Sequence, residues 1–568
     1  MNENGLIVAI DFGTHASGFA YASAGERAKP RHEQAVAMFR DWPGGQVFKY
    51  FKTRTALLRS HSGEIVAWGN EALLEYGALL RKGQGGQVRL RDGFKLNLTS
   101  ADSAVRSEAI KDAADYLRCL REKALAAVHD YGIVIDDRDI TWCITMPVTT
   151  AEGMTGYDAV LRGDVTGPAG FPADDRERLI LVAEPEAAAL YAKADREPGE
   201  RFTIVDAGGG TVDITTLQVN DDYTLDQIGL QAGGKFGSRI LNDKFRERLL
   251  RRLRESYGWQ KNASPNLEDW TTILNYWEED KRSWDFSSQH IYRVRIPRRI
   301  DDQGRGQSQA APVPGDGDLE MSSAEILSEI FEPLSSSIIG ELDKAQTDLP
   351  EGPPVREVLL VGGFGGSPYL QLRLAEHLAG KAALTILPDS GAAEAVLRGA
   401  VSYALNPEWI RARRMQHTYA CDVLVPCERP EDPHQTAHSR VRSVRWGPDE
   451  ELCSKLLVFA RRDEIVKAGT VRDVIPLYPA DCRQQTVTFS LFVSDEIDPY
   501  FPDGSRLLGR IEMPTKIPWW RSKYWRPIDI TVTLGDSEVI FCASDRRHPE
   551  ILREIRLSYF EADGEPHA

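Results

Sequence analysis

Two short glycine-containing turns carry acidic and hydroxyl side chains at corresponding places. In each, an apolar run ends at an aspartate, glycine and threonine follow, and a second apolar run begins. The residues are Asp11, Gly13 and Thr14 in the first turn, and Asp206, Gly208, Gly209, Gly210 and Thr211 in the second. A phosphate chain with a bound divalent metal needs closely approaching backbone N–H groups, carboxylates for the hydrated ion, and hydroxyls or a cation beside the terminal phosphate. The two turns together predict a site for a metal-bound polyphosphate.

The two turns differ in how specific they are. Taken alone, the first is equally typical of a plain β-hairpin. The second is more specific. Three consecutive glycines provide no side chains for packing and lose much conformational entropy on folding, which a purely structural hairpin does not require. Glu184 starts a predicted helix with Pro185 in its first turn, and it is a candidate to order a catalytic water or the metal shell. An ordinary acidic residue at a helix start, favoured by the helix dipole, is the alternative.

Other routes to nucleotide binding find no support in the sequence. A G-x-x-x-x-G-K-[ST] motif does not occur, which excludes a P-loop. The run Gly-Gly-Phe-Gly-Gly at 362–366 lacks the G-x-G-x-x-G spacing of a dinucleotide fold.

Regular elements must position the two turns. Apolar runs predict strands at 6–10, 19–21, 202–205 and 212–217, with further strands at 140–145 and 358–361. The pattern predicts helices at 104–128, 185–193, 238–284 (interrupted near Pro265) and 322–349. Residues 301–318 are polar and rich in Gly, Pro and Gln, which predicts a flexible insertion. The repeated strand–turn–strand unit predicts a duplicated α/β domain with a cleft between its halves.

The pattern changes after Pro407. Alternating β-type runs appear at 418–425, 455–460, 486–493 and 528–534, and breaks rich in Pro, Gly and Asp separate them. We therefore expect a separate β-rich domain over 413–568. Residues 518–526 hold three tryptophans and three cations, which suits a partner-binding loop or a loop packed on its own domain.

Bulk composition limits the classes of function. A chain of 568 residues with 42% hydrophobic and 27% charged residues is long enough for several units with their own cores. The net charge of -16 argues against nucleic acid as a main partner. Seven scattered cysteines without a C-x-x-C pair argue against a disulfide framework or a zinc ribbon. The sequence shows no secretory leader and no long apolar run, so we expect a cytoplasmic protein without a membrane span.

Five segments, in order, resemble the superfamily of actin, sugar kinases and heat-shock ATPases. They are IVAIDFGTHASG (7–18), LVAEPEAAAL (181–190), FTIVDAGGGTVDIT (202–215), LLVGGFGGSP (359–368) and AAEAVLRGAV (392–401). The second and third are similar to the 70-kDa heat-shock proteins. Phe364, the segment 94–98 and the short C-terminal part resemble the divergent protein-12 branch of that family.

The resemblance implies a fold and a set of ligands. The fold would be an α/β, actin-like (ribonuclease H-like) two-lobed ATPase domain over 1–412, with halves of roughly 1–200 and 201–412. A β-rich domain without a helical lid would follow over 413–568. The implied ligands are ATP or ADP and Mg²⁺, and the implied partners are protein clients or regulatory proteins that bind the C-terminal domain.

The resemblance also implies roles for residues in the motifs. Asp11 and Asp206 would hold Mg²⁺ through water. Thr14 and Thr211 would place hydroxyls beside the γ-phosphate. Glu184 would lie near the attacking water.

Further roles follow for residues outside the two turns. Lys95 matches the catalytic lysine of the family, although an exposed lysine would look the same in sequence. Glu278, Lys281 and Arg282 match the helix that clamps adenosine, and a surface pair at i,i+3 is the alternative. The remaining residues expected to contact the nucleotide, besides the glycines of the two turns, are His15, Gly234, Gly362, Gly363 and Phe364.

Several positions depart from the family pattern. His15 and Ala16 replace a threonine and an aromatic residue, Gly366 replaces an arginine that stacks on adenine, and Ala393 replaces an aspartate. These departures bear on nucleotide affinity and hydrolysis rate more than on the fold.

Three functions remain open at this point. The first is a slow Mg²⁺-dependent ATPase whose closure drives conformational switching in a chaperone or regulatory protein. The second is a nucleotide-responsive, non-catalytic scaffold that recruits a partner through its C-terminal domain. The third, a small-molecule kinase, is disfavoured by the heat-shock type of the segments 184–190 and 206–213.

Overall fold

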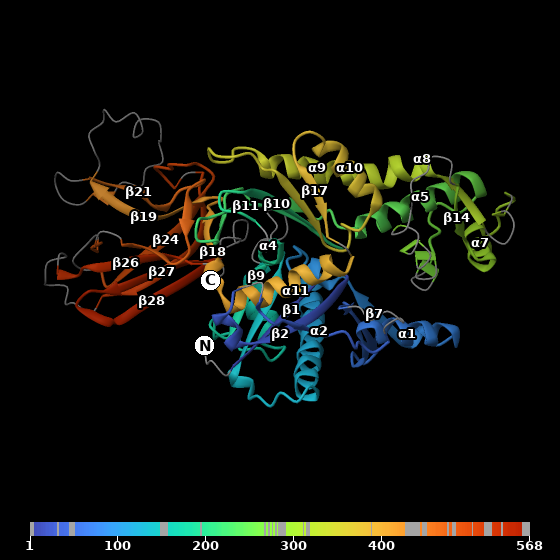
Figure 1. Ribbon diagram of the computed structural model, residues 1–568, viewed down its shortest axis with the longest axis horizontal. Helices are drawn as coiled ribbons and strands as arrows, with labels where there is room; N and C mark the ends of the chain where they lie inside the picture. Colours follow the sequence, from blue (N-terminus) through green and yellow to red (C-terminus); the bar gives the residue numbers. More distant parts are fainter. Residues whose placement is uncertain are drawn as a thin grey trace. The chain divides into compact units, whose positions relative to one another are not determined.

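A computed structural model describes most of the chain (Figure 1). The described residues are 5–30, 33–44, 51–147, 157–192, 196–265, 269–270, 273–274, 277–278, 281, 291–310, 312–313, 318–387, 389–426, 444–445, 451–473, 476–479, 484–502, 504–515, 525–535 and 538–558. The chain divides into two compact units, of which the first comprises Met1–Ala151, Val160–Leu217 and Gln231–Asn406. The second comprises Pro407–Ala568 with two short earlier segments.

The first unit contains a mixed sheet that carries the first turn. Its strands, in spatial order, are β3 (Ala37–Met38), β2 (Ala16–Ser23), β1 (Leu6–Asp11), β8 (Ile140–Met146) and β9 (Leu179–Ala183), with β4 (Thr53–Arg54) also paired to β2. Strand β1 is antiparallel to β2 and parallel to β8. Every residue of β1 and β8 is buried, which explains their continuous apolar sequences. Asp11 therefore lies at the carboxyl end of a central strand.

A second sheet in the same unit carries the second turn. Within this unit its strands are β17 (Ala383–Ile386), β16 (Glu357–Val361), β10 (Arg201–Ala207) and β11 (Val212–Val219), with β13 (Ala232–Gly234) paired to β11. Strand β10 is parallel to β16, as β1 is parallel to β8. Asp206 thus ends a central strand as Asp11 does. The mixed α/β class predicted from the sequence is confirmed.

Helices cover these sheets. They are α1 (Gly69–Arg81), α2 (Ser103–Asp130), α4 (Glu184–Ala192), α5 (Arg239–Tyr257), α9 (Glu332–Gln346), α10 (Pro368–Leu378) and α11 (Asp389–Leu405). The predicted helical region 238–284 is interrupted, as expected, but the interruption starts earlier than Pro265: α5 ends where Gly258 adopts a φ of 69°, and the described residues between 269 and 281 are helical again. Within the described ranges, no helix is long and apolar enough to cross a membrane.

Helices α4 and α11 pack against each other, and α11 also lies on β1 (Figure 1). The contact is close at one glycine: a Cβ atom at Gly399 would lie 1.7 Å from the backbone oxygen of Ala187. Any larger residue at this position would force the two helices apart.

Smaller elements complete the first unit. They are the sheet β6 (Ile65–Trp68), β5 (Ala56–Ser60) and β7 (Val88–Asp92), the 3₁₀ helix η4 (Phe94–Asn97), the hairpin β14 (Ile291–Arg295) and β15 (Asp318–Ser322), and α7 (Arg298–Arg305).

The prediction of a flexible insertion over 301–318 is wrong for its first part, which lies in α7. The buried Asp301 accepts hydrogen bonds from Trp259 Nε1 at 2.8 Å and from the backbone N–H of Val313 at 3.0 Å. The Asp301 carboxylate thereby holds this polar stretch against an apolar core. That core contains the stacked pair Phe245 and Trp277, whose ring centroids lie 4.3 Å apart.

Two antiparallel sheets lie in the second unit. One sheet contains β20 (Val444–Arg445), β21 (Glu451–Ala460), β19 (Thr418–Pro426), β24 (Thr486–Ser494) and β25 (Arg506–Pro514). Another contains β23 (Thr470–Asp473), β26 (Ile528–Leu534), β27 (Glu538–Asp545) and β28 (His548–Ser558). Phe459, Phe489 and Phe541 meet in its core. Among the described residues after Pro407 there is no α-helix, and most of the tryptophan-rich segment 518–526 lies outside the described residues.

We predict that Gly399→Ala destabilises the first unit by about 1–3 kcal/mol, because the added methyl group overlaps the Ala187 carbonyl. The matched control is Gly340→Ala in α9, where an added Cβ has no atom within 4 Å. This control should gain roughly 0.5–1 kcal/mol, since alanine favours a helix over glycine. Urea unfolding of both variants checks this, and equal midpoints would contradict the close helix contact.

Candidate functional site

The first turn places Asp11 in a buried position with two different partners. Its carboxylate accepts a hydrogen bond from the Thr145 hydroxyl at 3.2 Å and lies 2.5 Å from Lys52 Nζ. Thr145 belongs to β8, whose carboxyl end meets that of β1 because the strands are parallel. The Thr145 hydroxyl also accepts from the backbone N–H of Phe12 at 3.3 Å. The turn itself is held by Thr55, whose hydroxyl donates to the Gly13 carbonyl at 2.7 Å.

The second turn is fixed to the start of α5. Within the turn, the Gly208 N–H donates to the Thr211 carbonyl at 2.9 Å. The N–H groups at the beginning of α5 then donate to the carbonyls of the three glycines. These bonds join Gly237 to Gly210 at 3.1 Å, Ser238 to Gly208 at 3.2 Å and Arg239 to Gly209 at 2.9 Å. The turn and the helix therefore form one hydrogen-bonded piece.

The two turns face each other. A Cβ atom at Gly210 would lie 2.5 Å from Thr14 Oγ1, and one at Gly209 would lie 2.9 Å from His15 Cβ. Side chains at these positions would push the first turn away. The consecutive glycines are therefore explained by the close approach of two turns that are far apart in sequence.

Lys95 and Glu184 form a buried ion pair beside the turns. Lys95 lies in η4 and is 2% exposed, and its Nζ atom is 2.6 Å from Oε1 of Glu184, the first residue of α4. Lys95 is thus not an exposed surface lysine. The pair brings together two residues that were assigned roles from separate motifs.

Two further carboxylates crowd the same region. Burial raises the pKa of Asp206 to about 7, the negative charges of Glu184 and Asp11 add to the rise, and Lys52 and Lys95 oppose it. Asp213, on β11, is 1% exposed. Burial and then the charges of Glu184 and Asp206 raise its pKa well above the usual range.

Asp213 has little compensation for its burial. Among the described residues, neither of its carboxylate oxygens has a hydrogen-bond partner of normal geometry. The nearby Thr211 hydroxyl only partly offsets the rise in its pKa.

This cluster fits a hydrated divalent cation. Asp11, Glu184, Asp206 and Asp213 carry four negative charges when ionised, and only Lys52 and Lys95 oppose them in this group, which leaves two negative charges in excess. In the described part of the chain, no three His, Cys, Asp or Glu side chains are grouped closely enough to ligate one ion directly. An ion that keeps most of its waters, as Mg²⁺ does, matches both observations.

Glu278 and Lys281 lie in a separate polar group with α5. Asn242 of α5 donates to Glu278 Oε1 at 2.7 Å and accepts from Lys281 Nζ at 2.9 Å. Although burial opposes the shift, the ion pair with Lys281 lowers the pKa of Glu278 to about 2, and His15 contributes to the lowering. Arg282 lies outside the described residues.

The remaining predicted residues lie around Asp206. Gly362 has a φ of 84°, and a Cβ atom there would be 2.3 Å from Asp206 Oδ1, so glycine leaves room for the carboxylate. Phe364 donates its backbone N–H to Ala207 at 2.8 Å, while its ring is buried in the apolar core. Gly363 faces open space. Gly234, on β13, pairs with Val212 directly after the second turn.

Sequence reasoning missed four polar residues of this region: Lys52, Thr145, Asp213 and Asn242. Asp213 lies in a quoted motif, and its place in an apolar strand was a usable signal, because a buried carboxylate is costly. The other three lie outside the turns, and only the tertiary fold brings them to the site.

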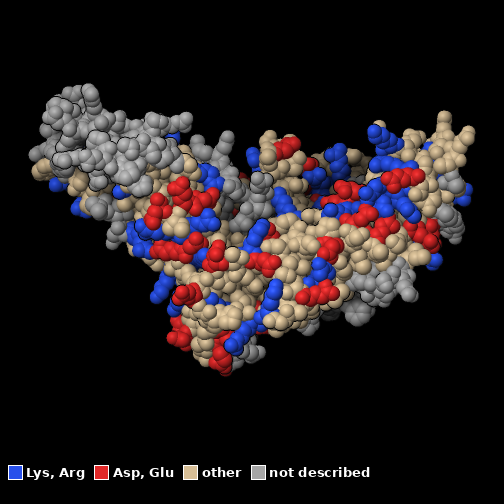
Figure 2. Space-filling view, turned by 90° about the horizontal axis from the view of Figure 1, so that it is seen from above, with Lys and Arg blue, Asp and Glu red and all other residues tan. Residues whose placement is uncertain are grey.

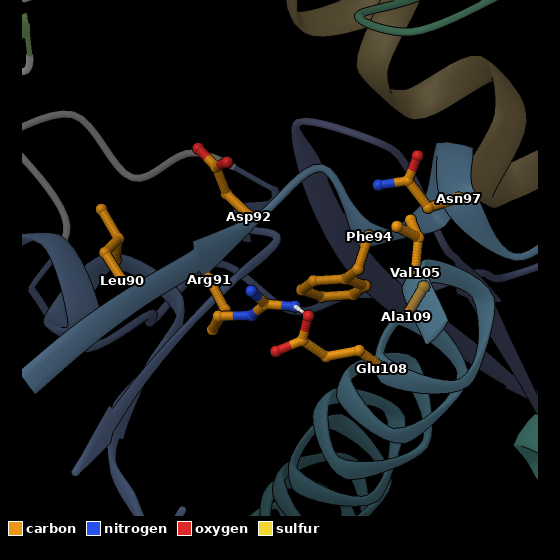
Figure 3. A pocket seen from close by; sticks show the side chains of 8 residues that line it. All are labelled: Leu90, Arg91, Asp92, Phe94, Asn97, Val105, Glu108 and Ala109. Carbon is orange, nitrogen blue, oxygen red and sulfur yellow. Dashed lines mark ion pairs between the residues drawn. The ribbon is translucent and has the colours of Figure 1, made fainter. Parts of the chain in front are cut away.

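A cavity of about 310 Å³ lies beside this region rather than between the two turns (Figure 3). Its lining residues are Leu90, Arg91, Asp92, Phe94, Asn97, Val105, Glu108 and Ala109. Figure 3 shows Arg91 and Glu108 pointing toward one another, at 3.0 Å in an ion pair. None of the predicted site residues lines this cavity. Two of its lining residues, Phe94 and Asn97, lie in η4, as Lys95 does.

Comparisons with known proteins agree with the motifs. No protein-family model matches the chain. The chain is 26% identical to human heat shock 70 kDa protein 12B over 535 residues, which cover 78% of this chain and 75% of that protein. It is 24% identical to mouse heat shock 70 kDa protein 12A over 504 residues, which cover 74% and 72%.

A bacterial relative matches a shorter part. The chaperone protein DnaK of Mycoplasmopsis synoviae is 24% identical over 247 residues, which cover 40% of this chain and 38% of that protein. The resemblance predicted from the five motifs is thus confirmed: the chain is similar to heat shock 70 kDa proteins 12A and 12B over about three quarters of its length.

Proposed function

We propose that this protein binds ATP and ADP with Mg²⁺ and hydrolyses ATP slowly, as part of conformational switching in a chaperone or regulatory protein. The observation that carries the proposal is the approach of the two Asp–Gly–Thr turns beside the buried Lys95–Glu184 pair. The nucleotide-binding domain would span 1–412, with halves of roughly 1–200 and 201–412 as its two lobes. The similarity to heat-shock proteins supports the assignment.

Each residue has a role that its surroundings allow. Asp11 and Asp206 would hold the hydrated Mg²⁺, which supplies positive charge for the phosphate oxygens when it is bound. Thr14 and Thr211 would donate hydroxyl hydrogen bonds to phosphate oxygens. Glu184 would orient the attacking water.

Lys95 keeps Glu184 in place. Its ammonium group, 2.6 Å from Glu184 Oε1, fixes the orientation of that side chain. An oriented carboxylate can accept a hydrogen bond from the water that attacks the γ-phosphate. Positioning of this kind is the main contribution that a protein makes to phosphoryl transfer.

Glu278 and Lys281 would hold the adenosine end. Because the pKa of Glu278 is lowered to about 2, this side chain is an anion at neutral pH and can accept from ribose hydroxyls. Asn242 fixes both side chains, and its own bond from Trp277 Nε1 at 3.0 Å anchors it to the core.

Closure of the nucleotide-binding domain would be transmitted to the β-rich domain 413–568, which would recruit protein clients or regulatory partners. We expect the protein in the cytoplasm. In the described part of the face shown in Figure 2, basic and acidic side chains are interspersed rather than gathered into a basic stripe. This distribution supports protein rather than nucleic acid as the macromolecular partner.

A second candidate is a scaffold that binds nucleotide without turning it over. Two observations favour it: Gly366 offers no side chain to stack on adenine, and the Phe364 ring is buried in the core. The intact carboxylates of the site favour the ATPase. Single-turnover phosphate release separates the two.

We predict that Asp206→Ala abolishes binding of Mg²⁺·ATP and lowers phosphate release by about 100-fold or more, because a carboxylate that holds the ion is lost. Titration calorimetry and phosphate release in the same samples measure both effects. The matched control is Asp243→Ala, at an exposed position of α5 where the side chain pairs with Arg246 at 3.5 Å. Binding by wild type without phosphate release would favour the scaffold, and unchanged behaviour of Asp206→Ala would contradict the assignment.

We predict that Mg²⁺·ATP binding strengthens with pH up to about pH 7 and then levels off. With a pKa of about 7, Asp206 is mostly protonated below that pH, and the proton must leave before the carboxylate can hold the ion. Affinity should therefore rise by up to about tenfold per pH unit below pH 7. Calorimetry of wild type from pH 5.5 to 8.5 checks this. An affinity that does not change with pH between 5.5 and 7 would contradict the pKa assignment.

A further inference from the structure

A short basic strand lies directly beside the first turn. Strand β4 pairs with β2, so that Arg54 is opposite Ala16 and Thr53 is opposite Ser17. Side chains two apart on an extended strand share a face, and Lys52 and Arg54 are two apart. Lys52 contacts Asp11 at 2.5 Å, and Arg54 contacts the ring of His15. Both cations therefore reach the turn that would hold the phosphates.

The surrounding structure fixes this strand. The Arg54 carbonyl accepts from the buried Tyr116 hydroxyl at 3.0 Å, and the Arg54 N–H donates to Asn70 Oδ1 at 3.1 Å. On the other face, Thr53 Oγ1 accepts from the Asn70 N–H at 2.9 Å. The backbone position of Arg54 is thus set before a ligand arrives, and Lys52 directly precedes this fixed strand.

Lys52 competes with a metal ion for the same carboxylate. One oxygen of Asp11 accepts from Thr145 and the other contacts Lys52, so both are engaged. A hydrated cation at Asp11 must displace or share the ammonium group. The Lys52 side chain is 16% exposed, compared with 4% for Asp11, so it has an open side toward which it can move.

We propose that Lys52 and Arg54 form a polyphosphate-binding pair, in which the Lys52 ammonium passes from Asp11 to a phosphate oxygen when a nucleotide binds. The inference rests on the proposed function, and it adds that nucleoside polyphosphates bind this site measurably without a divalent metal. Geometry supports it: Lys52 and Arg54 place two cations beside the turn, where each can pair with a phosphate oxygen. Mg²⁺ then strengthens binding less than it would at a site whose only cation is the metal.

The test measures ATP affinity by calorimetry, once with Mg²⁺ and once with EDTA, for wild type, Lys52→Met and Lys52→Arg. Methionine keeps the length of the side chain and removes its charge. In EDTA, Lys52→Met should bind ATP about tenfold or more weakly than wild type, and Lys52→Arg should bind nearly as wild type does. In Mg²⁺, the loss for Lys52→Met should be smaller, because Asp11 is then freed for the ion. Lys82→Met, at an exposed position after α1, is the matched control and should bind as wild type does.

Each contrary result has a distinct meaning. Wild type that binds ATP in Mg²⁺ but not in EDTA overturns this inference and leaves the proposed function intact. Equal affinities of wild type and Lys52→Met in EDTA overturn it as well. No binding by wild type in either condition contradicts the proposed function and this inference together. Thermal unfolding without ligand shows whether each variant is folded, and rescue by Lys52→Arg separates a role of the charge from a general loss of structure.

Discussion

The mutual repulsion of buried carboxylates is the constraint on which this structure depends. Asp11 and Asp206 lie at the carboxyl ends of central strands in two sheets. Burial raises the pKa values of Asp206 and Asp213, and Glu184 lies close enough to both to raise them further. Such a group is costly to bury unless cations or protons compensate it. Lys52 and Lys95 compensate part of the charge, and the raised pKa values show that protons supply more. The carboxylates of this cluster therefore favour a cation beside them.

The two turns show how a fold brings such groups together. Parallel strands place their carboxyl ends at one edge of a sheet, which brings Thr145 to Asp11. Glycines at 209 and 210 then allow one turn to approach the other. Helices α4 and α11 are held together in the same way, by a glycine at the point of contact. Small residues at points of contact thus set the geometry of the site as much as its charged residues do.

The sequence predicted local features of the fold well and long-range contacts poorly. Strand ends at Asp11 and Asp206 follow from apolar runs that stop at glycine turns. The partners Lys52 and Asn242 carried no local signal, because they act only through tertiary contacts. Residues 301–318 show the converse error: their polar composition indicated flexibility, yet Asp301 is buried by its bond to Trp259. Composition alone does not reveal that a distant tryptophan supplies a hydrogen-bond donor.

The hydrogen bonds made by α5 bear on how the proposed site would distinguish a nucleoside diphosphate from a triphosphate. Its first N–H groups are bonded to the second turn, and Asn242, one helical turn further on, is bonded to Glu278 and Lys281. The rise between Arg239 and Asn242 is only about 4.5 Å. A helix segment of that length does not bend easily. If the proposed nucleotide binds, a displacement of the turn by a terminal phosphate would therefore be carried to Glu278 and Lys281, and a diphosphate and a triphosphate would leave these two side chains in different positions.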